Sequence, residues 1–116
     1  MSAFSPRQIA RLTTMVLAAA VLAGMPGVAV AAPRTHTVVI DKMKFGAIPT
    51  NLRVGDVILW VNKDIFRHTA TARDHSFNVD IAPSQTARTV LRRSGAVPFF
   101  CTFHPGMKGQ LIVARK

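Results

Sequence analysis

Residues 57–61 have the sequence VILWV, and residues 62–64 (NKD) follow them as a turn. A short apolar run that is rich in β-branched and aromatic residues and ends at a turn is typical of a strand with both faces covered. Such a strand lies inside a sheet that packs against a second layer. The segment therefore predicts the central strand of a β-sandwich.

Other strand-like segments lie on both sides of this run. They are residues 37–40 (TVVI), 68–72 (HTATA), 86–91 (TARTVL), 97–103 (VPFFCTF) and 111–113 (LIV). Turn-forming residues separate them at intervals of about ten residues, a spacing typical of sandwiches and barrels. No window after residue 31 shows helical periodicity. The pattern predicts an all-β fold and argues against alternating strands and helices.

The first 31 residues have a different composition from the rest. Arg7 and Arg11 precede an apolar run at residues 15–24 (MVLAAAVLAG), and a small-residue A-x-A sequence ends at Ala31. A basic start, a short apolar middle and a small-residue end are the three parts of a secretory signal peptide. We therefore expect residues 1–31 to be a helical signal peptide and residues 32–116 to form the exported domain, in the periplasm or secreted.

An uncleaved membrane anchor is the alternative interpretation of this segment. Its apolar run is shorter than the roughly 20 residues that a spanning helix needs, and Pro26 and Gly27 interrupt any longer count. We expect no stable membrane span after cleavage.

The single cysteine of the chain needs an explanation. Cleavage after Ala31 leaves 85 of 116 residues, and a domain of this size often needs a disulfide or a metal to stabilise it. One cysteine cannot form an internal disulfide. In an oxidising compartment it must pair between chains, stay buried or bind a ligand.

The charge of the domain is strongly positive. Without Arg7 and Arg11, 13 of the 15 basic residues remain against 5 acidic ones, which gives a net charge of +8. Nucleic acid is the usual partner of such a charge, but an exported protein rarely meets it. The basic residues are also scattered. We expect a solvated basic surface and no nucleic-acid binding. An acidic protein partner is favoured, and an anionic membrane surface is the other partner that this charge suits.

Residues 101–107 (CTFHPGM) carry the most informative motif. They place a thiol (Cys101), an imidazole (His104) and a thioether (Met107) at C-x2-H-x2-M spacing, and Pro105 and Gly106 turn the chain between the last two. Two histidines, one cysteine and a weak axial methionine form the ligand set of blue electron-transfer copper sites. Zinc sites use no methionine, so this set favours copper.

The second histidine must come from elsewhere in the chain. His68 is well placed because it follows the strand at residues 57–61 and the next loop, where neighbouring strands could set it beside Cys101. We expect His75 to lie in an exposed loop and His36 near the start of the domain, neither as a ligand. The expected ligands are therefore His68, Cys101, His104 and Met107.

The chain resembles the cupredoxins, the blue copper proteins, over residues 38–113. Three segments carry the resemblance: residues 57–62 (VILWVN), 68–71 (HTAT) and 99–109 (FFCTFHPGMKG). The short C-x2-H-x2-M loop is most similar to that of amicyanin, with plastocyanin as the next kind. The resemblance implies a Greek-key β-sandwich with one type 1 copper ion that passes single electrons between redox proteins.

The resemblance also implies roles for residues around the copper. Asn62 is expected to join the two ligand loops by hydrogen bonds, and the backbone N–H of Thr69 to donate to the Cys101 sulfur. Thr102, next to Cys101, is expected among the residues that surround the ligands. Related proteins have asparagine where this chain has Thr69. His104 would be the electron-transfer port, and its surroundings the docking surface: Phe103, Pro105 and Gly106.

Two other functions remain open. A periplasmic copper-binding protein for sequestration or delivery would use the same four residues. A copper enzyme would need a further centre, but only His36 and His75 remain and no H-x-H pair exists. We therefore expect a monomeric electron carrier that is not an enzyme, with a dehydrogenase, cytochrome or reductase as its partner.

Overall fold

The computed structural model describes residues 15–27 and 31–116. Its described part contains strands and no helix. The strands are β1 (Thr35–Asp41), β2 (Lys44–Phe45), β3 (Leu52–Arg53), β4 (Val57–Asn62), β5 (His68–Ala72), β6 (Asn78–Ile81), β7 (Thr86–Val90), β8 (Gly95–Phe100) and β9 (Lys108–Ala114).

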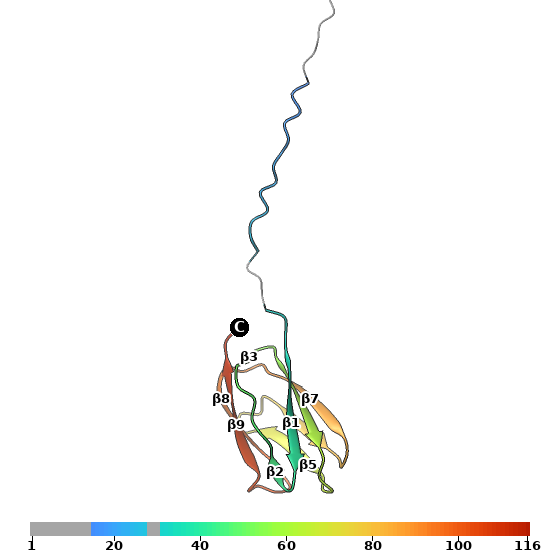
Figure 1. Cartoon of the computed structure of the whole chain (residues 1–116). Coiled ribbons are helices and arrows are strands. Elements are labelled where there is room, and N and C mark those ends of the chain that lie inside the picture. Colours follow the sequence, from blue (N-terminus) through green and yellow to red (C-terminus); the bar gives the residue numbers. More distant parts are fainter. Residues whose placement is uncertain (1–14, 28–30) are drawn as a thin grey trace, which may run out of the picture.

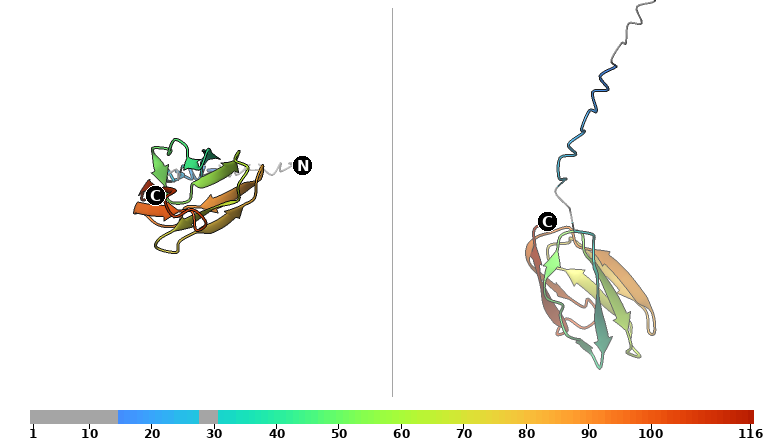
Figure 2. Two further views of the ribbon diagram at one scale, coloured as in Figure 1. Left: turned by 90° about the horizontal axis from the view of Figure 1, so that it is seen from below. Right: turned by 45° about the horizontal axis from the view of Figure 1, so that its top comes forward.

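The strands form two sheets that pack face to face (Figures 1 and 2). One sheet has the order β2-β1-β4-β7 and the other β3-β9-β8-β5-β6. Strand β4 lies inside the first sheet, where it pairs in parallel with β1 and antiparallel with β7. The expected all-β sandwich is therefore confirmed, with residues 57–61 in the position that their sequence predicts.

Aromatic side chains fill the space between the sheets. Trp60 of β4 and Phe99 of β8 are fully buried, with ring centroids 5.2 Å apart in an edge-to-face arrangement. Phe45 contacts both rings. The indole N–H of Trp60 donates to the hydroxyl of Thr89 at 2.9 Å, which satisfies the only polar group of that side chain. This core joins the two sheets firmly beneath the loops at one end.

The topology brings the two functional loops together. Strand β5 pairs antiparallel with β8, so Thr71 lies opposite Phe100. Because antiparallel neighbours place the start of one strand beside the end of the other, His68 at the start of β5 lies near Cys101, which directly follows β8.

Some boundaries differ from the expected ones. Residues 101–103 were expected to extend the strand at β8, but β8 ends at Phe100 and the chain turns into the motif loop. Strand β6 was not expected, because its four residues NVDI give too short an apolar-polar alternation to be recognised alone.

The helix expected in the N-terminal segment is absent from residues 15–27, which carry exposed apolar side chains. An isolated apolar run of this length has no packed partner, and short helices without one are marginal in water. Residues 1–14 and 28–30 lie outside the described residues, so the remainder of this expectation is not addressed. Across the described ranges, no helix combines the length and apolar character needed to cross a membrane.

Candidate metal centre

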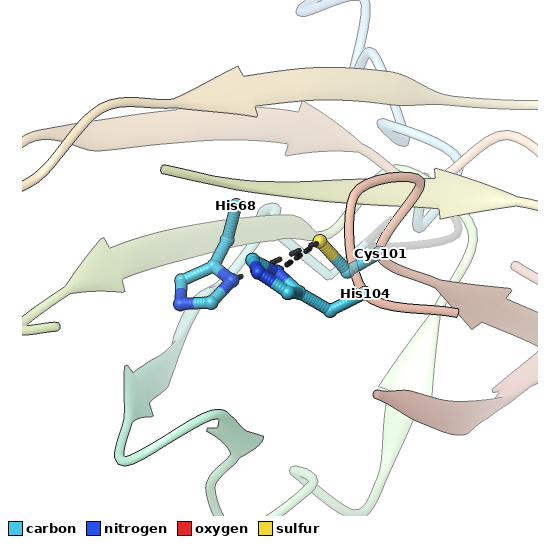
Figure 3. Close-up of side chains that lie close together, drawn as sticks. All are labelled: His68, Cys101 and His104. Atoms are coloured by element: carbon cyan, nitrogen blue, oxygen red, sulfur yellow. Dashed lines mark hydrogen bonds between the residues drawn. The ribbon is translucent and has the colours of Figure 1, made fainter. Parts of the chain in front are cut away.

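Three of the four expected ligands lie together at one end of the sandwich (Figure 3). The Sγ atom of Cys101 lies 3.7 Å from Nδ1 of His68 and 3.7 Å from Nδ1 of His104. All three donor atoms are within 4.8 Å of one another. Because metal–ligand bonds to nitrogen and sulfur are about 2 Å long, sulfur–nitrogen separations of 3.7 Å allow the thiol and each imidazole to bind one shared ion.

The three residues differ in how far they are buried. His68 and Cys101 are fully buried, whereas His104 is half-buried in the loop between β8 and β9. Their rings and thiol point toward one another from two segments that are 33 positions apart in the chain. The group therefore has one accessible side, and His104 lies on it.

Met107 closes the motif loop. Its backbone N–H donates to the carbonyl of His104 at 2.8 Å, and its own carbonyl accepts from the N–H of Cys101 at 3.0 Å. The side chain of Met107 is buried in the core cluster that includes Cys101. The short spacing from His104 to Met107 thus folds the loop back onto the backbone of Cys101, as the Pro-Gly turn predicts.

The carboxylate of Asp64 holds His68 from the opposite side of the ring. Oδ2 of Asp64 lies 2.9 Å from Nε2 of His68, and both side chains are buried. The hydrogen bond from His68 is the main reason that the pKa of Asp64 is below its usual value, and the backbone N–H of Met43 adds to the effect. Sequence reasoning did not identify Asp64, because an i, i+4 spacing indicates contact only on a helix, and residues 64–67 form a loop that leads into β5.

Thr69 joins the two ligand loops. Its backbone N–H lies 3.3 Å from the Cys101 sulfur, as the resemblance implies. Its hydroxyl oxygen also accepts from the N–H of Thr102 at 2.8 Å and lies 3.2 Å from the Thr102 hydroxyl. In this chain, the hydroxyl of Thr69 therefore makes the side-chain contact between the His68 loop and the Cys101 loop.

Asn62 has a different role from the one expected. Its amide donates to the carbonyls of Phe66 at 2.8 Å and Ile81 at 3.0 Å, and its oxygen accepts from the N–H of Asp64. No hydrogen bond joins it to residues 101–107 within the described part of the chain. Asn62 therefore orders the loop before His68 and joins it to β6. Thr69 makes the connection to the Cys101 loop.

An apolar surface surrounds the exposed edge of His104. Phe103 is 53% exposed, and Pro105 and Gly106 are also exposed. The loop before His68 adds Ile65 and Phe66, which are 80% and 48% exposed. We call these five residues and His104 the histidine patch. In the sequence, Ile65 and Phe66 form an apolar pair inside an otherwise polar loop, which is the local indication of an exposed contact surface.

The Phe66 ring lies edge-to-face against the imidazole of His104, with centroids 6.1 Å apart. The two loops therefore form one continuous surface.

The other two histidines lie away from this centre. His75 is exposed in a turn with a positive φ of 65°. His36 of β1 contacts the buried carboxylate of Asp56 at 3.0 Å. Since His36 lies beside Ile58 and the metal centre begins after Asn62, this pair is at the opposite end of the sheet.

The donor set fits copper chemically. Cysteine and methionine are soft ligands and imidazole is intermediate, a combination that selects copper over magnesium or calcium. A buried thiol between two imidazole nitrogens is also a poor arrangement for a merely structural cysteine, because the hydrophobic core gains nothing from two neighbouring ring nitrogens.

Comparison with known proteins gives a consistent result. No family model matches the chain. The curated amicyanin of Paracoccus versutus is 27% identical over 80 aligned positions, which cover 64% of this chain and 61% of that protein. The chain thus spans about three fifths of the length of that relative.

Solved amicyanin structures match the fold. The crystal structure of Paracoccus versutus amicyanin has a TM-score of 0.58 and 26% identity, covering 73% of this chain and 85% of that one. A reduced Cu(I) form of an amicyanin variant at pH 4 has a TM-score of 0.59 and 25% identity, covering 73% and 86%.

Proposed function

We propose that this amicyanin-like protein of the cupredoxin fold is a type 1 copper protein that carries single electrons. The observation that carries the proposal is the convergence of His68, Cys101 and His104, with donor atoms within 4.8 Å, at the end of a sandwich like that of amicyanin. Met107 would complete the ligand set, since the motif loop folds back and hydrogen-bonds its backbone to that of Cys101.

The protein's own residues would hold the site rigid. The thiol of Cys101 is fixed by the Thr69 N–H, and Nε2 of His68 is fixed by Asp64. Copper would supply the Cu(I)/Cu(II) couple. A site whose ligands keep their positions in both oxidation states needs little rearrangement, which favours rapid electron transfer.

His104 is the proposed electron port. It is the only one of the three donors with an accessible ring, and the apolar histidine patch surrounds it. A small apolar surface suits a brief encounter with a redox partner. The positive charge of the domain would steer an acidic partner toward the protein, more weakly as salt rises.

We propose the periplasm or the extracellular space as its location, a cleaved signal peptide at residues 1–31 and a monomeric state. In this role the protein is a carrier between a donor and an acceptor, such as a dehydrogenase, a cytochrome or a reductase, and does not itself act as an enzyme.

Cyclic voltammetry of the copper-loaded protein tests the electron-transfer role against copper delivery. We expect a reversible one-electron wave with copper occupancy unchanged over repeated cycles. An irreversible wave, together with rapid loss of Cu(I) to a copper chelator of moderate affinity, would contradict electron transfer and favour delivery.

A further inference from the structure

We propose that Asp64 is a positioning residue of the copper centre, which fixes the imidazole of His68 with Nδ1 free to bind and stabilises the oxidised ion through its negative charge. This inference rests on the proposed copper function for its second part only. Its first part concerns the protein without metal.

The hydrogen bond between the two residues decides which ring nitrogen carries the proton. An ionised carboxylate can only accept, so Nε2 of His68 must donate across the 2.9 Å contact. The neutral ring then has its lone pair on Nδ1. That atom faces the Cys101 sulfur at 3.7 Å, where a metal would lie. Asp64 therefore selects the tautomer that can bind.

The carboxylate is itself held from two elements. Oδ2 accepts from the N–H of Met43, in the turn between β1 and β2, at 2.9 Å, and Oδ1 accepts from the N–H of Ile65 at 2.8 Å. Met43 has a positive φ of 61°, a conformation that non-glycine residues adopt rarely. The strained turn thus places an N–H on Asp64, and the ring of His68 cannot rotate without breaking this network.

The carboxylate of Asp64 hydrogen-bonds to one of the two proposed ligand histidines, His68. In the described part of the chain, the sole hydrogen-bond contact of the His104 ring is with Cys101. A buried carboxylate next to a ligand imidazole increases its donor strength, and a negative charge favours the more positive ion. Through His68, the carboxylate of Asp64 should therefore stabilise Cu(II) relative to Cu(I) and lower the reduction potential.

Asp56 and His36 provide a matched control in the same chain. They form a buried carboxylate-histidine contact of almost the same length, 3.0 Å, at the other end of the sandwich. The substitution Asp56→Asn makes the same chemical change at the other end of β4. Asp56 is six residues from Asn62, which corresponds to about 20 Å of extended strand. It controls for the general effect of removing a buried carboxylate.

The first measurement is ¹⁵N NMR of His68 in the metal-free full chain, in the wild type, Asp64→Asn, Asp64→Glu and Asp56→Asn. We expect a protonated Nε2 and a bare Nδ1 in the wild type, in Asp64→Glu and in Asp56→Asn, and a mixture of tautomers in Asp64→Asn. A wild-type His68 with the proton on Nδ1 would overturn the proposal, whether or not any variant folds.

The second measurement is the reduction potential of the copper-loaded proteins. We expect the ratio of Cu(II) to Cu(I) affinity to fall about tenfold in Asp64→Asn, which is a rise of about 59 mV for one electron. Asp64→Glu and Asp56→Asn should stay near the wild-type potential. An unchanged potential in Asp64→Asn, or an equal rise in Asp56→Asn, would contradict the charge effect. Failure to bind copper would reject the proposed function but leave the tautomer result standing.

Discussion

The hydroxyl oxygen of Thr69 accepts a hydrogen bond from the backbone N–H of Thr102 at 2.8 Å, between residues 33 positions apart. Thr69 directly follows His68, and Thr102 directly follows Cys101. One hydroxyl group therefore fixes the distance between the two loops that supply the metal donors.

Thr69→Val should loosen this connection. Valine has nearly the same shape but no acceptor, so the Thr102 N–H loses its partner, and a part-buried hydrogen bond of this kind contributes about 0.5–1.5 kcal/mol. We expect a lower free energy of unfolding in urea and a broader visible copper band, because the Cys101 loop gains freedom. Thr69→Ser keeps the hydroxyl and should lose less than half as much stability. A Thr69→Val protein as stable as the wild type would show that the hydrogen bond contributes nothing, and equal losses in both variants would show that the methyl group contributes as much as the hydroxyl.

Gly109 of β9 is expected to be intolerant of a side chain. A Cβ atom at this position would lie 2.5 Å from Cζ of Phe99, whose ring is fully buried and packed against Phe45 and Trp60. Gly109→Ala should therefore lower the free energy of unfolding by about 1–3 kcal/mol, the usual cost of overpacking.

Gly106→Ala is the control for this change, because no atom lies within 4 Å of the added Cβ there. Its stability should match the wild type or exceed it slightly. A Gly109→Ala protein as stable as this control would mean that the Phe99 ring shifts at little cost.

Acid should destabilise the metal-free protein through Asp56. Burial raises the pKa of this carboxyl, but hydrogen bonds from Arg34, His36 and Arg53 outweigh burial and hold the pKa below its usual value of 3.8. A group with a depressed folded-state pKa stabilises the protein above its unfolded pKa, and this stability is lost as pH falls through the folded value.

Urea unfolding of the metal-free protein between pH 6 and 2.5 measures this effect. We expect stability to fall from about pH 4–5 downward in the wild type, and the fall to be shallower in Asp56→Asn. Parallel curves for the two proteins would rule out Asp56 as a source of the acid sensitivity, which would leave Asp64 and Asp74, whose pKa values are also lowered.

The sequence contained most of the fold and the donor set, for reasons that particular residues illustrate. Continuous apolar runs such as residues 57–61 mark buried strands, and the C-x2-H-x2-M spacing brings its donors together within one loop. These are local signals. Asp64 was missed because its role depends on a contact with Met43, which is 21 positions away. The hydroxyl of Thr69 was missed because its partner, Thr102, is 33 positions away. Only the folded sandwich brings these residues together.

The histidine patch should control encounters between protein molecules. Ile65 is 80% exposed beside the loop of His104, and Ile65→Lys adds a positive charge to this surface. Two positively charged copies then repel each other more strongly at the contact, so electron self-exchange should slow several-fold at low salt and recover as salt rises. NMR line broadening in mixtures of oxidised and reduced protein measures the rate.

Ile112→Lys is the matched control for this prediction. Ile112 is 61% exposed on β9, beside Ala96 and four residues beyond Lys108, away from the metal centre. Equal slowing in both variants would mean that total charge controls the rate and that the patch has no special role.

Copper bound by the Cys101 thiolate together with His68 and His104 has a characteristic visible absorption. The visible absorption spectrum of the full chain loaded with Cu(II) tests this ligand set most directly, with Cys101→Ser as the control. We expect an intense blue thiolate-to-copper band that bleaches reversibly on reduction and is absent from Cys101→Ser. A wild-type protein that binds Cu(II) without this band, or that binds no copper, would show that Cys101 is not a copper ligand.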